Sequence, residues 1–184
     1  MSKKTLIING SPRLNGDTMT LIHELKRHLK GEVVEISAYR SNISPCLDCR
    51  RCQITNACCI QDDMNIIYND DYDNVVLASP VYYATLPGPV LSLLSRFQNQ
   101  HALIAQGKRP ELRVKKSGLI LTAGGAKNNY EKALHHVWVL FRMTNAKGFE
   151  EHIVKSVKTD TLPAAQDEKA LADCKELARW LNEE

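Results

Sequence analysis

Short apolar runs alternate with longer amphipathic segments along this chain, and this alternation constrains its fold most strongly. Residues 74–78 (Asn-Val-Val-Leu-Ala) are nearly all apolar, which is typical of a strand buried on both faces of a parallel sheet. Further strands are predicted at 5–8, 33–36, 117–123 and 149–157. Helices are predicted at 18–29, 62–68, 87–100, 128–143 and 165–181.

Five strands alternating with helices predict a doubly wound α/β fold, a five-stranded parallel sheet in the order 2-1-3-4-5. The length of 184 residues favours a single domain, residues 1–184, with a cysteine-rich loop at 39–60. Such sheets bind ligands beyond the carboxyl ends of their strands. The loops after strands one, three and four are therefore the places to look for a site.

Composition excludes several classes of protein. Apolar residues make up 43% of the chain and charged residues 24%, which is the balance of an ordinary globular protein. The net charge of +3 is too small to indicate a nucleic acid or an anionic membrane as partner. No apolar run approaches the ~20 residues that span a bilayer. A secreted disulfide scaffold would be shorter and would spread its cysteines, so we expect a cytoplasmic protein.

The loop after the first predicted strand has the composition of an anion site. It enters a helix, whose first N–H groups carry partial positive charge, and it offers hydroxyl and guanidinium donors. It matches neither the dinucleotide-binding glycine motif nor the P-loop. The alternative is a plain strand-to-helix turn with Asp17 as N-cap. The candidate phosphate-binding residues are Ser11, Arg13, Asn15, Gly16, Asp17 and Thr18.

The loops after strands three and four are suited to a flat ring. Prolines stiffen the first loop, tyrosines offer planar surface, and small residues in the second allow close approach. Backbone N–H groups of two such loops can hold the polar edge of a heterocycle. Alternatively, the tyrosines are core or interface aromatics. The candidate residues are Pro80, Val81, Tyr82 and Tyr83 in one loop and Thr122, Ala123, Gly124 and Gly125 in the other.

These three motifs, in this order over residues 4–126, resemble the NAD(P)H-dependent FMN reductase family of flavodoxin-like proteins. The resemblance implies FMN, with its phosphate held by Ser11, Arg13, Gly16 and Thr18. Residues 80–83 and 122–125 would then hold the isoalloxazine. It also implies a nicotinamide electron donor and a homodimer whose partner completes the nicotinamide slot. The family usually has Asn at the position of Asp17.

Five of the six cysteines fall within fourteen residues. Four thiolates at this spacing can converge on one centre and suit an iron–sulfur cluster. With Asp62 and Asp63 following, the run resembles the iron–sulfur flavoprotein branch of the family, which carries a [4Fe-4S] cluster beside FMN. Metal-free thiols, with Cys58 and Cys59 redox-reactive, and zinc remain as alternatives. The candidate ligands are Cys46, Cys49, Cys52 and Cys58, whereas Cys174 lies on an apolar helix stripe.

The leading functional hypothesis is an oxidoreductase that passes a hydride from NAD(P)H to FMN and on to an unknown small-molecule or protein acceptor. The cofactor performs this chemistry, so no catalytic side chain is named. An iron–sulfur flavoprotein acting in electron transfer is the first alternative. A non-enzymatic redox-sensing module that uses thiols and no flavin is the second.

Overall fold

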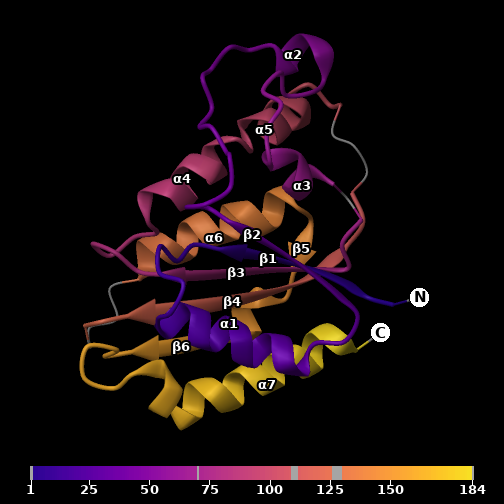
Figure 1. Ribbon diagram of the computed structural model, residues 1–184. Coiled ribbons are helices and arrows are strands. Elements are labelled where there is room, and N and C mark those ends of the chain that lie inside the picture. The colour runs from indigo at the N-terminus through magenta and orange to yellow at the C-terminus, as the bar shows by residue number, and fades with distance from the viewer. Residues whose placement is uncertain (1, 70, 109–111, 126–129, 184) are drawn as a thin grey trace.

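The computed structural model describes residues 2–69, 71–108, 112–125 and 130–183, and every strand pairing in it is parallel (Figure 1). The strands are β1 (Lys4–Asn9), β2 (Glu32–Ser37), β3 (Asn74–Pro80), β4 (Lys115–Ala123), β5 (Ala146–Lys147) and β6 (Ile153–Val157). They run in the order β2-β1-β3-β4, and β5 and β6 share the fifth place beside β4. The predicted doubly wound sheet with order 2-1-3-4-5 is therefore confirmed.

Helices cover both faces of the sheet, as a doubly wound fold requires (Figure 1). Those of the described residues are α1 (Asp17–His28), α2 (Cys52–Thr55), α3 (Met64–Tyr68), α4 (Gly88–Ser95), α5 (Gln98–Ala105), α6 (Glu131–Met143) and α7 (Glu168–Asn182), with 3₁₀ turns η1 (Phe149–Glu151) and η2 (Ala164–Gln166). Helices α1 and α7 lie on one face, while α4 and α6 lie on the other. The short α2 belongs to the cysteine-rich segment, which projects above α5 (Figure 1).

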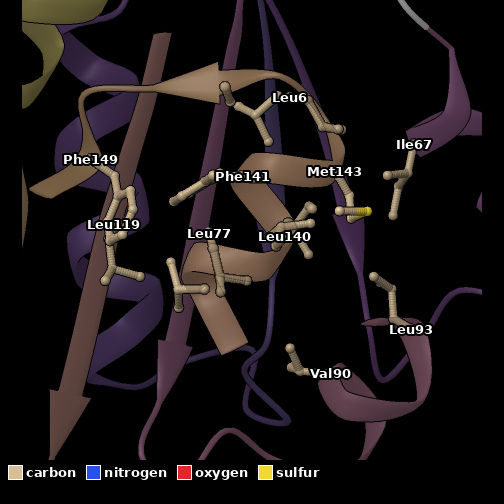
Figure 2. Packing of buried hydrophobic residues seen from close by; sticks show 14 of the residues in the cluster. Leu6, Ile67, Leu77, Val90, Leu93, Leu119, Leu140, Phe141, Met143 and Phe149 are labelled. Carbon is tan, nitrogen blue, oxygen red and sulfur yellow. The ribbon is translucent and has the colours of Figure 1, made fainter. Parts of the chain in front are cut away.

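Two apolar cores sandwich the sheet because successive side chains of a strand point to opposite faces. Along β1, Leu6 and Ile8 join the core under α6, whereas Ile7 joins the core under α1 and α7. Figure 2 shows Phe141 of α6 packed over the strands. Its ring centroid lies 5.0 Å from that of Phe149. Burial on both faces explains why β3 reads as a continuous apolar run.

The fifth strand begins later than predicted. Residues 149–151 form η1, and only residues 153–157 form β6. Gly148 adopts a left-handed backbone with φ of 91°, which turns the chain before Phe149. The Phe149 side chain is then buried in the core rather than placed in the sheet. Aromatic and β-branched composition alone does not distinguish these two uses of the segment.

The predicted helix at 87–100 is two helices, α4 and α5, with a break at Arg96 and Phe97. At the break the N–H of each residue donates to the carbonyl three positions earlier, which tightens the turn. The tighter turn brings the Arg96 side chain into the interior, where it is 1% exposed. The helix predicted at 128–143 begins at Glu131, and its first two predicted residues lie outside the described residues.

Candidate functional site

The loop after β1 is held in shape by its own side chains. The carboxamide oxygen of Asn9, the last residue of β1, accepts the N–H of Ser11 at 2.8 Å. The Ser11 hydroxyl lies 3.2 Å from both the N–H and the C=O of Arg13. Ser11 is buried and Arg13 is exposed, so the turn is fixed while the guanidinium is available to a ligand.

This turn delivers the N-terminus of α1 to the carboxyl edge of the sheet. The N-cap of α1 is Gly16, which has no side chain to occupy the first N–H groups of the helix. A Cβ at Gly16 would lie 3.4 Å from the Arg13 side chain, so the arginine packs directly over the helix start. Free helical N–H groups beside a guanidinium form a site for an anion.

Two buried hydroxyls join the first turn of α1 to the end of β4. The side-chain oxygens of Thr18 and Thr122 lie 2.7 Å apart, and both residues are buried. The backbone C=O of Thr122 accepts the N–H of Val81 at 2.8 Å. The end of β4 therefore fixes the positions of the loops on either side of it.

The loop after β3 forms a tight turn. The N–H of Tyr82 donates to the C=O of Thr85 at 2.9 Å, and the reverse bond is 3.0 Å. Tyr83 and Ala84 at its tip have positive φ values of 52° and 62°. The Tyr83 side chain is fully exposed. The N–H groups of Val81 and Tyr82 are already used, so they do not hold the edge of a heterocycle in this arrangement.

A fourth loop, after β6, completes this edge of the sheet. The N–H of Thr159 donates to the C=O of Ala123 at 3.0 Å. A Cβ at Gly124 would lie only 2.4 Å from the carboxylate of Asp160. Thr159 and Asp160 are not among the residues predicted from the sequence. The signal for them was the fifth parallel strand, whose carboxyl end must meet the same edge.

These loops border an open pocket, which we call the site pocket. Among the predicted residues, Asn15, Tyr83 and Gly125 do not line the pocket. The lining residues are Ser11, Arg13, Gly16, Asp17, Thr18, Pro80, Val81, Tyr82, Thr122, Ala123, Gly124, Thr159 and Asp160.

Asp17 has a structural partner that explains a carboxylate beside an anion site. It is the first residue of α1 rather than the N-cap. Its Oδ1 accepts the N–H of Ala164, the first residue of η2, at 2.8 Å. The carboxylate therefore ties α1 to the segment that leads into α7, and one of its oxygens is directed at that segment.

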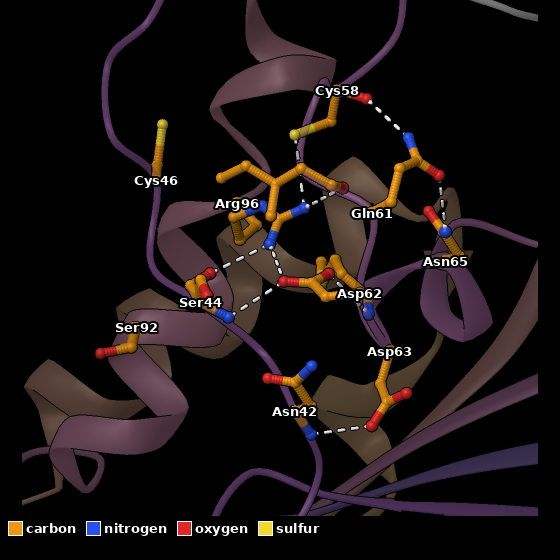
Figure 3. A network of polar contacts seen from close by, with 12 residues as sticks. Asn42, Ser44, Cys46, Cys58, Gln61, Asp62, Asp63, Asn65, Ser92 and Arg96 are labelled. Atoms are coloured by element: carbon orange, nitrogen blue, oxygen red, sulfur yellow. Dashed lines mark hydrogen bonds and ion pairs between the residues drawn. The ribbon is translucent and has the colours of Figure 1, made fainter.

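The cysteine-rich segment, residues 39–60, is anchored by a buried arginine, and we call this segment the thiol loop (Figure 3). The Arg96 guanidinium donates to the Asp62 carboxylate at 2.6 Å and to the C=O of Ser44 at 3.0 Å. It also donates to the C=O of Ile60 at 3.2 Å and to the sulfur of Cys58 at 3.3 Å. Arg96 therefore fixes both ends of the cysteine run against the break between α4 and α5.

The charge of Arg96 is balanced by Asp62. Burial by itself would raise the pKa of Asp62. Hydrogen bonds from Arg96 and from the backbone N–H groups of Ser44 and Met64 outweigh burial, so the pKa of Asp62 lies below its ordinary value. The pair is therefore ionised near neutral pH, and a buried cation stands beside Cys58.

The thiols share one pocket. Its lining includes Cys46, Cys49, Cys52, Cys58, Cys59 and Arg96. The N–H of Arg51 and the neighbouring thiol of Cys59 lower the pKa of Cys49. Burial and the nearby thiols raise the pKa of Cys52. Within the described residues, no three His, Cys, Asp or Glu side chains stand close enough together to hold a metal ion.

The sixth cysteine has no part in this pocket. Cys174 of α7 is buried in the core under α1, as its apolar stripe predicted. Its sulfur lies 3.6 Å from the C=O of Leu21, to which the thiol donates. Burial raises the pKa of Cys174 to about 12, so it stays a neutral thiol.

A family model for NADPH-dependent FMN reductases matches residues 3–156. The chain belongs to the NADPH-dependent FMN reductase family. The family is named for the NADPH-dependent reduction of FMN. None of the helices in the described ranges is both long and apolar enough to cross a membrane.

The chain is similar in sequence to known proteins and similar in fold to solved structures. Two iron-sulfur flavoproteins of Methanocaldococcus jannaschii are 32% and 28% identical to the chain over 98 and 155 residues. These alignments cover 50% and 79% of this chain, but only 51% and 75% of the relatives. An FMN-dependent NADH-azoreductase of Bacillus anthracis, solved in complex with FMN, is 16% identical. Its TM-score is 0.68, over 98% of this chain and 100% of that one.

The site pocket fits the two chemical parts of FMN. The uncapped start of α1, the Arg13 guanidinium and the Ser11 hydroxyl match a phosphate in charge and in donor type. The Asp160 carboxylate packs against the bare backbone of Gly124, where a Cβ would lie, so this glycine lets the loops after β4 and β6 meet at the edge of the pocket. Tyr82 borders the open side of the same pocket.

Proposed function

We propose that the chain binds FMN in the site pocket and accepts a hydride from NAD(P)H, which it passes to an acceptor that is still to be identified. The observation that carries this proposal is the meeting of an anion-binding helix start with three further loops in one open pocket. Membership of the FMN reductase family supports it.

The residues have separate tasks in this proposal. The first turn of α1, with Ser11, Arg13 and Thr18, holds the phosphate, while residues 80–82 and 122–124 hold the ring. Bound FMN supplies the hydride-accepting chemistry. Tyr82 borders the open face on which a nicotinamide ring can stack. No side chain is required as an acid or a base.

The test compares two flavins that differ only in the phosphate. R13M should weaken FMN binding by roughly tenfold to a hundredfold, because a charge-assisted hydrogen bond contributes about 1.5–3 kcal/mol. It should leave riboflavin binding unchanged. R179M, an exposed arginine on α7, serves as the matched control and should alter neither affinity. Equal losses for both flavins, or no loss for FMN, would show that Arg13 does not bind the phosphate.

A second function, electron transfer through a [4Fe-4S] cluster, is favoured by the thiol loop. Cys46, Cys49, Cys52 and Cys58 line one pocket, and the buried Arg96 can offset the negative charge of a thiolate cluster. A cluster is wider than a single ion, so its ligands do not need to meet at one point. The names of the two archaeal relatives support the same reading.

Anaerobic purification with analysis of iron and sulfide tests the cluster. Wild-type protein should contain close to stoichiometric iron and sulfide, and C58S should lose most of both. C59S is the matched control, because Cys59 is not one of the four proposed ligands. C59S should keep its iron and sulfide. Iron-free protein from cells grown with ample iron would leave the flavin proposal intact and refute the cluster.

We further propose that residues 1–184 form one domain and that the protein acts as a cytoplasmic homodimer. A single sheet shared by both cores supports the one domain. The fully exposed Tyr83 beside the open pocket supports a partner subunit at that place. Exposed free thiols suit a reducing compartment. Sedimentation velocity should give twice the mass of 20.7 kDa, and a monomer at micromolar concentration would contradict the homodimer.

A further inference from the structure

One thiol has no role in the functions proposed above. The spacing that suits a cluster uses Cys46, Cys49, Cys52 and Cys58, and Cys174 is buried in the core. Cys59 is left over, yet it is exposed and its sulfur lies 3.3 Å from the sulfur of Cys49. We propose that Cys49 and Cys59 are a redox-active thiol pair that a small-molecule disulfide oxidises to an intramolecular disulfide.

The choice of partner follows from the arrangement of the loop. Cys58 and Cys59 are neighbours in sequence, but the sulfur of Cys58 is directed at the buried guanidinium of Arg96 (Figure 3). The sulfur of Cys59 is directed at Cys49 instead. Cys49 and Cys59 are both exposed, so an oxidant can reach either one. A disulfide bond measures about 2.05 Å, so the two sulfurs need to approach by on the order of 1 Å.

The reaction is a thiol–disulfide exchange in two steps. The thiolate of one cysteine attacks the small disulfide, forms a mixed disulfide and releases one small thiol. The second cysteine then attacks the protein sulfur of the mixed disulfide and releases the second small thiol. In total two protein S–H bonds and the S–S bond of the small disulfide are broken, while one protein S–S bond and two S–H bonds of the released small thiols form. The small disulfide takes the two electrons and two protons, and the short separation makes the second step intramolecular.

Oxidation of the pair would also affect the proposed cluster, and this part of the inference rests on that proposed function. Cys49 is one of the four proposed ligands, so a Cys49–Cys59 disulfide removes a ligand. The disulfide form and the cluster form should therefore exclude each other. The disulfide itself requires no cluster, and the two parts can be tested separately.

The first experiment treats full-length, iron-free protein with oxidised glutathione, followed by a thiol count after denaturation. Wild-type protein should fall from six free thiols to four. Trypsin cuts after Arg50 and Arg51, so the oxidised pair should join two peptides that reduction separates. C46S, C52S and C58S should still form the link. C49S and C59S should instead stop at a mixed disulfide, with one glutathione per chain.

A link that persists in C49S or C59S, or that disappears in C46S, C52S or C58S, would assign the disulfide to other cysteines and overturn the proposal. So would a wild-type protein that stops at the mixed disulfide. In the second experiment, iron and sulfide are offered to wild-type protein in its dithiol form and in its disulfide form. The dithiol form should take up iron at once, whereas the disulfide form should take it up only after a reductant has opened the disulfide. If the disulfide forms but neither form of the protein takes up iron, the cluster is refuted and the proposed thiol pair is not.

Discussion

The guanidinium of Arg96 donates a 2.6 Å hydrogen bond to the carboxylate of Asp62, and both side chains are buried. Removal of one partner from a buried ion pair leaves an uncompensated charge, which costs about 3–5 kcal/mol. We expect R96M to lower the free energy of unfolding in urea by roughly 3 kcal/mol or more. K169M, which breaks the exposed pair with Asp173, should change it by less than about 1 kcal/mol. Equal midpoints for R96M and wild-type protein would contradict this role of Arg96.

The same pair predicts a pH dependence of stability. Because the folded-state pKa of Asp62 is lowered, its contribution is fully present above the unfolded value of about 3.9 and is lost as the pH falls toward the folded value. The stability difference between wild-type protein and D62N should therefore be constant from pH 7 to about pH 5 and shrink below about pH 4. Urea unfolding across this range measures it. A stability difference between wild-type protein and D62N that grows as the pH falls would contradict this role of Asp62.

Two neighbouring glycines provide a matched test of the site pocket. A Cβ at Gly124 would meet the Asp160 carboxylate at 2.4 Å, whereas a Cβ at Gly125 would meet nothing within 4 Å. The Asp160 carboxylate must move to make room for a Cβ at Gly124, and both residues line the pocket, so G124A should weaken FMN binding. G125A should leave the affinity unchanged in the same fluorescence titration. Equal FMN affinities of G124A and G125A would show that Gly124 is not part of the FMN site.

The turn after β3 stores backbone strain that can be released. Ala84 has a φ of 62°, and a left-handed backbone costs a residue with a Cβ about 1–2 kcal/mol. A84G should therefore raise the free energy of unfolding by about 1 kcal/mol and leave the rate of NADPH oxidation unchanged.

Y82A should lower the rate of NADPH oxidation because Tyr82 borders the open face of the pocket. Unchanged turnover in Y82A would show that Tyr82 is not part of the nicotinamide slot.

Much of the fold could be predicted because its signals are local. The apolar run at 74–78 indicated a strand covered on both faces, and the alternation of strands with helices indicated the doubly wound order. The loops after strands one, three and four followed from the rule that ligands bind at the carboxyl edge. Most of the residues predicted there line the site pocket.

The features of the fold and the site that could not be predicted depend on contacts between segments that are distant in sequence. The break at Arg96 requires Asp62 and the carbonyls of the thiol loop, and neither can be recognised from the helical pattern around residue 96. Thr159 and Asp160 reach the pocket only because β6 lies beside β4. The cysteine spacing likewise did not indicate that Cys59, rather than another thiol, faces Cys49.

Hydride transfer to the flavin is tested by anaerobic mixing of FMN-loaded protein with NADPH, and separately with NADH, while the absorbance of oxidised flavin is followed. At least one of the two nucleotides should bleach the flavin completely, at a rate that saturates with nucleotide concentration. Tightly bound flavin that dithionite bleaches, but that keeps its oxidised spectrum with both nucleotides, would contradict the proposed function.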